Sequence, residues 1–256
     1  MKNINLLAFC TLSILLGGAC TKNSNSTHGI PGSTNSTTTI TPSAATSYFG
    51  ILSITSAQTV QQGNNLFPAI IFSQAYFSNT ATAYFSPSTF VKVDSVSLSG
   101  KIFKFSNYEY QDTTYQITYP PATWHVKGLA TIPSFTYTST TPLPTFTGYA
   151  TLPDTIHIGQ AVTIAITGVT GSDETSIIIS DGSNASGHTV SQTLAASATS
   201  VTFPASSLSS LTATTATTTA NAFINVGCIK HNVQSVNGLP MDFQMSYQVD
   251  KTIYIK

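Results

Sequence analysis

Few side chains of this chain are candidates for nucleophiles or metal ligands. The three cysteines, Cys10, Cys20 and Cys228, lie far apart, and the five histidines are scattered, with no pair at the spacing of metal ligands. No Gly-x-Ser-x-Gly motif marks a serine nucleophile. Cys228 lies in phase with Ile224 and Val226, which predicts a buried core residue rather than a reactive thiol. We therefore expect no catalytic residue, no metal and no cofactor.

The acidic residues offer one adjacent pair, Asp173 and Glu174, in the segment TGSDETS. A glycosidase needs two carboxylates that face each other across the scissile bond. Neighbours in a strand point to opposite faces, and neighbours in a turn are usually solvated. The sequence therefore favours a protein that is not an enzyme, and a secreted or anchored hydrolase acting on carbohydrate is the alternative.

Aromatic residues give a lead to a ligand. The segment NYEYQDTTYQITYPPATWHVKG contains Tyr108, Tyr110, Tyr115, Tyr119 and Trp124. Aromatic rings stack on sugars and contribute to protein interfaces, so this cluster predicts a binding surface for a neutral glycan or an envelope protein. The alternative is a core role, which the sequence favours for Trp124 because residues 124 and 126 share one strand face and residues 125 and 127 the other.

Charge is scarce in this chain. Asp, Glu, Lys and Arg make up 7% of the residues, against roughly 25% in average soluble proteins. All nine basic residues are lysine, and the net charge is +0. Without a basic cluster or an arginine fork, the sequence excludes a nucleic-acid partner. Ser, Thr, Asn and Gln must make the surface polar.

The first 20 residues, MKNINLLAFCTLSILLGGAC, have the parts of an export signal. Lys2 precedes an apolar core from Leu6 to Leu16, which is too short for a permanent membrane span, and small residues follow it. Residues 1–19 are therefore predicted to be a signal peptide. Residues 20–47 are rich in Ser, Thr and Asn and are predicted to form a flexible tether.

The small residues before Cys20 resemble the lipobox of bacterial lipoproteins, although Gly17 stands where Leu is usual. Together with the low-charge, Ser/Thr-rich body, this relaxed motif resembles lipoproteins of the Bacteroidota type. The resemblance implies a lipid anchor on Cys20. It also implies the outer membrane, since Thr21 is not the Asp that retains some lipoproteins at the inner membrane; the face of that membrane stays open. The alternative is a secreted protein with an incidental cysteine.

Three short segments resemble the O-glycosylation pattern of envelope proteins from the same bacterial group: DSV at Asp94, DTT at Asp112 and DTI at Asp154. The resemblance implies glycans on Ser95, Thr113 and Thr155. Ordinary turn chemistry is the alternative.

Beyond residue 47 the apolar residues alternate with period two, which predicts an all-β protein. The pattern is clearest in DFQMSYQVDKTIYIK, which is predicted to be a half-buried strand, and recurs in AVTIAITG, SFTYTST and TYQITY. Only FPASSLSSLT is expected to form a turn of helix.

Pro142 and Pro144 interrupt the strand pattern and suggest a boundary between two β-sandwich domains, 48–145 and 146–256. The second resembles an immunoglobulin-like sandwich in its order of about seven strands. A single fused domain is the alternative.

Overall fold

The structure, a computed structural model, describes residues 40–42, 48–61, 64–77, 91–103, 107–112, 114–128, 132–182, 188–214 and 222–256. The described residues form mostly β-strands, so the all-β prediction is confirmed at the level of fold class. The strands up to residue 139 are β1 (Ile40–Pro42), β2 (Gly50–Gln61), β3 (Asn65–Leu66), β4 (Ile70–Phe77), β5 (Val91–Val93), β6 (Val96–Ser97), β7 (Ser99–Phe103), β8 (Asn107–Gln111), β9 (Ala122–Val126) and β10 (Phe135–Ser139).

The later strands are β11 (Thr145–Phe146), β12 (Thr155–Ile156), β13 (Val162–Ala165), β14 (Val169–Thr170), β15 (Glu174–Ser180), β16 (Thr189–Ala195), β17 (Ser200–Phe203), β18 (Phe223–Lys230), β19 (Val233–Val236), β20 (Leu239–Thr252) and β21 (Tyr254–Ile255). A 3-10 turn, η2 (Gly148–Thr151), and one short helix, α1 (Ala205–Leu208), complete the described elements. The helix lies within the segment FPASSLSSLT, as predicted.

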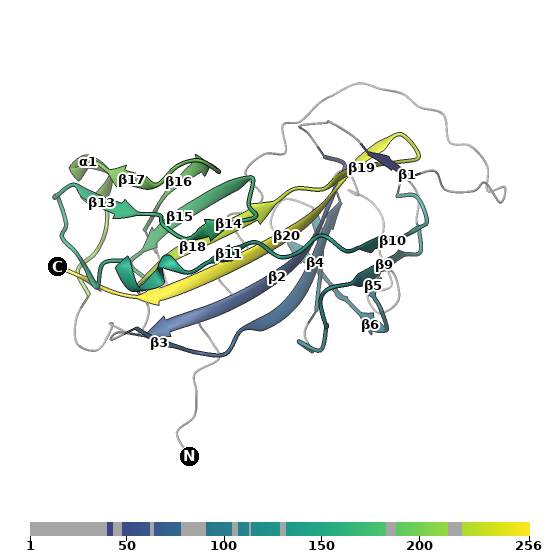
Figure 1. Cartoon of the computed structure of the whole chain (residues 1–256), viewed down its shortest axis with the longest axis horizontal. Helices are drawn as coiled ribbons and strands as arrows, with labels where there is room; N and C mark the ends of the chain where they lie inside the picture. Colours follow the sequence, from purple (N-terminus) through teal and green to yellow (C-terminus); the bar gives the residue numbers. More distant parts are fainter. Residues whose placement is uncertain are drawn as a thin grey trace, which may run out of the picture.

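One large sheet runs the length of the molecule (Figure 1). Its central path is β16-β15-β18-β20-β2-β4-β8-β7. The two longest strands, β2 and β20, lie side by side and parallel, paired from Gly50 with Met241 to Val60 with Lys251. All other pairs along that path are antiparallel. Strands from both halves of the sequence therefore share one hydrogen-bonded sheet.

The predicted alternation along the last long strand is present in β20. Phe243, Met245 and Val249 face the apolar cores. Gln244 and Ser246 lie on the opposite face, where Ser246 Oγ and Thr55 Oγ1 of β2 are 2.6 Å apart in a hydrogen bond. This strand was expected to be half-buried, but both of its faces are buried. The second face keeps its polar residues because hydroxyl and amide side chains pair with one another across the strands.

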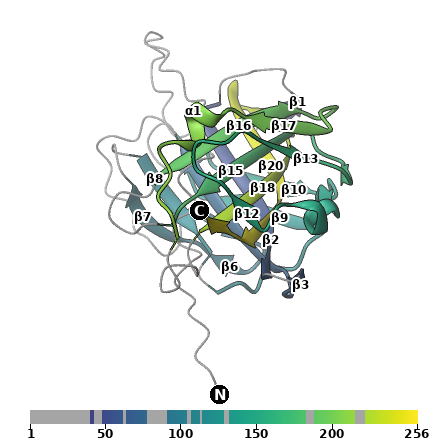
Figure 2. The same ribbon diagram turned by 90° about the vertical axis from the view of Figure 1, so that its left-hand side faces the viewer.

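Two hydrophobic cores lie along the sheet and define two lobes. The first lobe packs β9, β10 and β5 against β2, β4 and the start of β20, around Trp124, Phe77 and Phe243. The second lobe packs β13 and β17 against β15, β18 and the end of β20, around Phe146, Phe203 and Ile179. Figure 2 looks along the molecule from the second lobe and shows these small sheets layered over the long strands.

The predicted domain boundary at residues 145 and 146 separates the two cores only in part. Phe243 and Met245 come from the second half of the sequence but pack in the first core, whereas Val60 comes from the first half and packs in the second. The sheet itself has no break there, because β2 pairs with β20 over eleven residue pairs.

One strand prediction was wrong. Residues 115–119 of the segment TYQITY belong to no strand, although Ile117 and Tyr119 are buried. The Asp112 carboxylate accepts hydrogen bonds from the backbone N–H groups of Thr114 (2.7 Å) and Tyr115 (3.2 Å), and Tyr115 has φ +54°. After this turn the burial still alternates from residue 116 to residue 119, but these residues belong to no strand.

Candidate functional site

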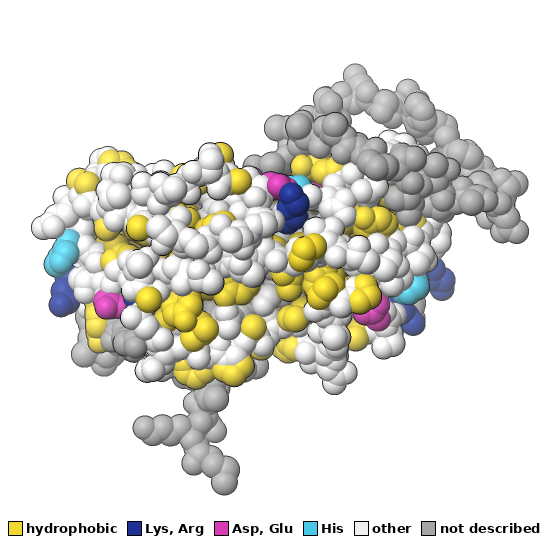
Figure 3. Space-filling view, viewed as in Figure 1, with side chains coloured by type: hydrophobic (Ala, Val, Ile, Leu, Met, Phe, Trp, Pro, Cys, Tyr) yellow, Lys and Arg dark blue, Asp and Glu magenta, His cyan; other side chains and the backbone are white. Residues whose placement is uncertain are grey.

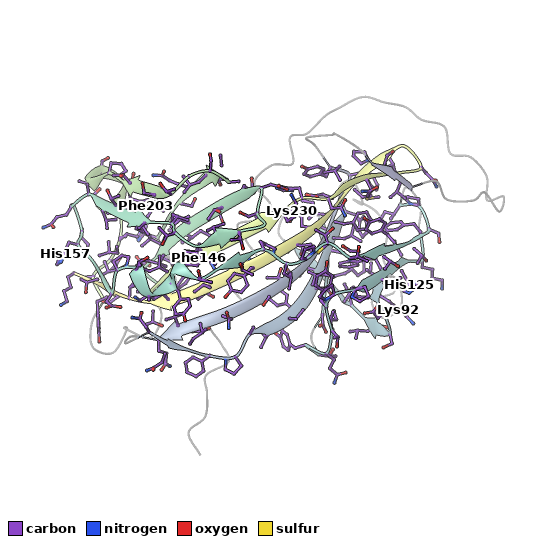
Figure 4. The ribbon with its side chains drawn as sticks, in the orientation of Figure 1. Lys92, His125, Phe146, His157, Phe203 and Lys230 are labelled. Atoms are coloured by element: carbon purple, nitrogen blue, oxygen red, sulfur yellow. The ribbon has the colours of Figure 1, made fainter. Side chains whose placement is uncertain are left out.

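Among the described residues, the densest group of charged side chains lies where the two lobes meet. We call Asp173, Glu174, Lys230, His231 and Asp242 the waist cluster. Lys230 Nζ donates to Asp173 Oδ1 at 2.6 Å, and the His231 backbone N–H donates to Asp173 Oδ2 at 2.9 Å. Lys230 lies on the rim between the lobes in Figure 4, and Figure 3 shows charged side chains of both signs together there.

His231 lies between two carboxylates. Its Nδ1 donates to Asp242 Oδ2 at 2.6 Å, and its Nε2 is 3.8 Å from Glu174 Oε1. The hydrogen bond with Asp242 and the interaction with Glu174 raise the pKa of His231 to about 10, although burial opposes the shift. The ring is therefore an imidazolium at neutral pH and cannot accept a proton as a general base does.

Asp242 is the buried anchor of the waist cluster. Its side chain is fully buried, and it also accepts hydrogen bonds from the Asn232 backbone N–H (3.1 Å) and from Gln244 Nε2 (2.8 Å). Asn232 Nδ2 in turn donates to the Tyr137 hydroxyl of the first lobe at 2.8 Å. The cluster thus links the β15–β18 end of the second lobe to β10 of the first.

Sequence reasoning missed this cluster. It treated Asp173 and Glu174 as a solvated turn and did not connect them with Lys230 and His231. The missing step is the register of β15 against β18, which places Glu174 opposite Ile229. The available signal was the presence of two adjacent pairs of titratable residues in a chain with very few charges.

The five aromatic candidates do not form one exposed surface. Tyr110 and Trp124 are 0% exposed in the first core, and Tyr119 is 8% exposed, with its hydroxyl donating to the Thr141 carbonyl oxygen. Tyr108 lies in β8, but its side chain is outside the described residues. Tyr115 is the candidate that reaches the surface, at 42% exposure. The alternation expected around Trp124 is confirmed, since 124 and 126 are buried and 125 is exposed.

Tyr115 is held in place from two sides. Its ring packs edge-on against Phe72 of β4, with centroids 6.4 Å apart, and its backbone N–H is bound by Asp112. The Asp112 carboxylate is buried, and its Oδ1 also accepts from the Thr114 hydroxyl at 2.7 Å. This arrangement presents an aromatic ring to solvent in a fixed position.

The predicted modification sites lie in different surroundings. Ser95 is exposed in the two-residue turn between β5 and β6. Thr155 is half-buried in β12, which pairs with β21. Thr113 and Cys20 lie outside the described residues. Cys228 is 0% exposed, as expected for a core residue, and burial raises the pKa of its thiol to about 11.

Within the described ranges, no group of three or more His, Cys, Asp and Glu side chains is placed to hold a metal ion. None of the described helices has the length and apolar character of a membrane span. The chain matches no protein-family model, no curated protein and no solved structure.

Proposed function

We propose that this chain is a non-enzymatic cell-envelope lipoprotein that acts as a binding module for a neutral glycan or an envelope protein partner. The observation that carries the proposal is the exposed ring of Tyr115, fixed against Phe72 on a protein with almost no charge. An aromatic ring stacks on the C–H face of a sugar without any need for charge. A neutral polar surface also avoids the desolvation of charged groups on binding.

The waist cluster supports a non-enzymatic role. Both nitrogens of His231 face carboxylates, and the pKa of its ring is raised far above neutrality. The Lys230 amine is paired with Asp173. We therefore interpret this cluster as an ionic link between the lobes. The alternative is a hydrolase acting on carbohydrate. It would need one carboxylate of the waist cluster as general acid and another as nucleophile or general base.

The anchor and the finer fold belong to the same proposal. Cys20 would carry the lipid, residues 20–47 would serve as tether, and the protein would be exported to the outer membrane. The second lobe would be an immunoglobulin-like sandwich, supported by β13 and β17 packing over β15, β18 and β20 around one core. Glycans on Ser95, Thr113 and Thr155 are part of the proposal, and Ser95 has the exposure that such a modification needs.

The test is a glycan-binding screen with the chain from residue 20 onward carrying Cys20→Ser, because all described residues lie within this portion. Tyr115→Ala is expected to lower the affinity for any bound neutral glycan at least tenfold with an unchanged melting temperature, because the ring is exposed. Tyr254→Ala, in the half-buried β21 strand of the other lobe, is the control and should bind normally.

Two outcomes would contradict the proposal. Binding to no glycan and no envelope protein would remove the ligand-binding role. Release of reducing sugar from a polysaccharide, abolished by Glu174→Gln, would instead establish the hydrolase.

A further inference from the structure

We infer that the short loop that joins β3 to β4, with Leu66, Phe67 and Pro68 exposed along the edge of β2, inserts into the interface of a lipid bilayer. We call these three residues the apolar loop. The inference goes beyond ligand binding and rests on the proposed lipid anchor only for what brings the protein to a membrane.

The apolar loop is an unusual feature of this surface. Only three large hydrophobic side chains are exposed among the described residues, and two of them, Leu66 and Phe67, are neighbours at 40% exposure each. All residues from Asn64 to Ala69 are exposed, and none of them is charged. Figure 3 shows hydrophobic atoms gathered at this end of the molecule, around β3 and the adjoining edge of β2. Single exposed apolar residues are common, whereas Leu66 and Phe67 together form a small exposed apolar patch.

The loop is held in its exposed conformation by hydrogen bonds. The Phe67 backbone N–H donates to the Thr59 carbonyl oxygen at 2.9 Å. Gln58 Nε2 donates to the Phe67 carbonyl oxygen at 3.3 Å, and the Tyr247 hydroxyl donates to Gln58 Oε1. At the base, Lys251 Nζ donates to Asn64 Oδ1 at 3.2 Å. These hydrogen bonds hold the backbone of the loop against the edge of β2.

The size of the loop distinguishes a bilayer from a protein partner. Two side chains at 40% exposure present on the order of 150 Å², whereas a stable dimer buries about 800 Å² on each partner. A bilayer accepts a small apolar patch, since an interfacial segment needs to enter by only about 5–10 Å. Because the loop has no lysine, we expect insertion without a preference for anionic lipids.

The segment between Cys20 and β1 is long enough for the apolar loop to contact the membrane that holds the anchor. Strand β1 pairs with β19 at the opposite end of the sheet, and β2, with 12 residues, covers roughly 40 Å from there to the loop. The segment from Cys20 to Thr39 is about 20 residues long and can reach about 65–70 Å when extended. An anchor on Cys20 and the apolar loop can therefore touch the same membrane.

The test uses the chain from residue 20 onward with Cys20→Ser, so that no lipid anchor contributes, and vesicles of phosphatidylcholine alone. We expect weak sedimentation with the vesicles that falls at least tenfold in the double variant Leu66→Ser, Phe67→Ser. Tyr115→Ser removes the third exposed large hydrophobic side chain, on the other lobe, and should leave sedimentation unchanged. Adding phosphatidylserine should change binding less than twofold.

Several results would overturn the inference. The inference is wrong if the parent chain does not sediment with the vesicles, or if the loop variant and Tyr115→Ser lose sedimentation equally. It is also wrong if sedimentation requires anionic lipid. A concentration-dependent dimer that the double variant abolishes would make the loop a contact between copies. Because the anchor is absent from this assay, failure here leaves the role of Cys20 and the glycan proposal standing.

Discussion

The pKa of His231 is far from its ordinary value. Its pKa is raised from 6.5 to about 10, mainly by the hydrogen bond with Asp242. A group whose pKa rises on folding stabilises the fold fully below its unfolded pKa, and this contribution is lost as pH rises through the folded value. The waist cluster should therefore weaken progressively between about pH 6.5 and 10.

The variant His231→Gln tests this expectation. It should lower the unfolding free energy by about 2 kcal/mol at pH 6, since hydrogen bonds to charged groups are lost. It should also flatten the fall in melting temperature between pH 7 and 10. His125→Gln is the control, because His125 is exposed and contacts Thr136. Equal pH slopes in the parent chain and in His231→Gln would show that the imidazolium does not hold the lobes together.

The ionised form of Asp250, unlike the His231 imidazolium, is expected to destabilise the fold at neutral pH. Burial raises its pKa to about 6, although a hydrogen bond from Asn225 Nδ2 at 2.9 Å opposes the shift. The folded chain then binds a proton that the unfolded chain has released, so this residue's contribution to stability falls as pH rises from about 4 to 6. We expect Asp250→Asn to raise the urea midpoint at pH 7 and to leave it unchanged at pH 3.5. A lower midpoint at pH 7 would contradict the assignment.

At the scale of the elements, Lys251 fastens the end of β20. Its side chain is 1% exposed, and its Nζ donates to the Leu152 carbonyl oxygen at 2.6 Å and pairs with Asp154 Oδ1 at 2.9 Å. Removing the amine takes a hydrogen-bond donor away from the Leu152 carbonyl oxygen and from Asn64 Oδ1 at the base of the apolar loop. Lys251→Met should therefore lower the unfolding free energy by about 1–3 kcal/mol, measured by urea denaturation.

Lys92→Met provides the matched control for Lys251, because Lys92 is half-buried in β5 and no ion pair is described for it. If Lys251→Met lowers the unfolding free energy by no more than Lys92→Met does, the buried amine contributes little to holding β20.

Local patterns predicted individual elements better than they predicted pairing. Alternation around Trp124 and along β20 indicates strands because side chains of successive residues leave opposite faces. The same pattern in residues 115–119 failed, since burial alternates there after the turn at Asp112 without any strand pairing. Burial of Trp124 was the interpretation that its strand alternation favoured, whereas the exposure of Tyr115 depends on that turn.

Long-range register explains most of what the sequence did not reveal. Parallel pairing of β2 with β20 joins residues almost 200 positions apart, and no local signal specifies it. The waist cluster has the same origin, because Asp242 meets His231 only through the pairing of β19 with β20. The apolar loop was also missed, since periodicity does not distinguish an exposed Leu66 from a core leucine.

For the whole molecule, the shared sheet predicts cooperative unfolding. The chain has one tryptophan, in the first core, and Cys228 lies in the second. In the chain from residue 20 with Cys20→Ser, Cys228 is the remaining thiol. Urea curves followed by Trp124 fluorescence and by Cys228 thiol labelling should have the same midpoint, because β2 and β20 belong to both lobes. Midpoints separated by more than about 1 M would show two independent domains.

The proposed role depends most on attachment to a membrane, which we assign to a lipid on Cys20. Cells that express the full chain would be grown with a fatty-acid analogue, and the protein would be tested for label and for membrane association. We expect Cys20→Ser to abolish the label and to release the protein, whereas Cys228→Ser keeps both, because Cys228 is buried. A Cys20→Ser protein that stays labelled and membrane-bound would contradict the lipoprotein account.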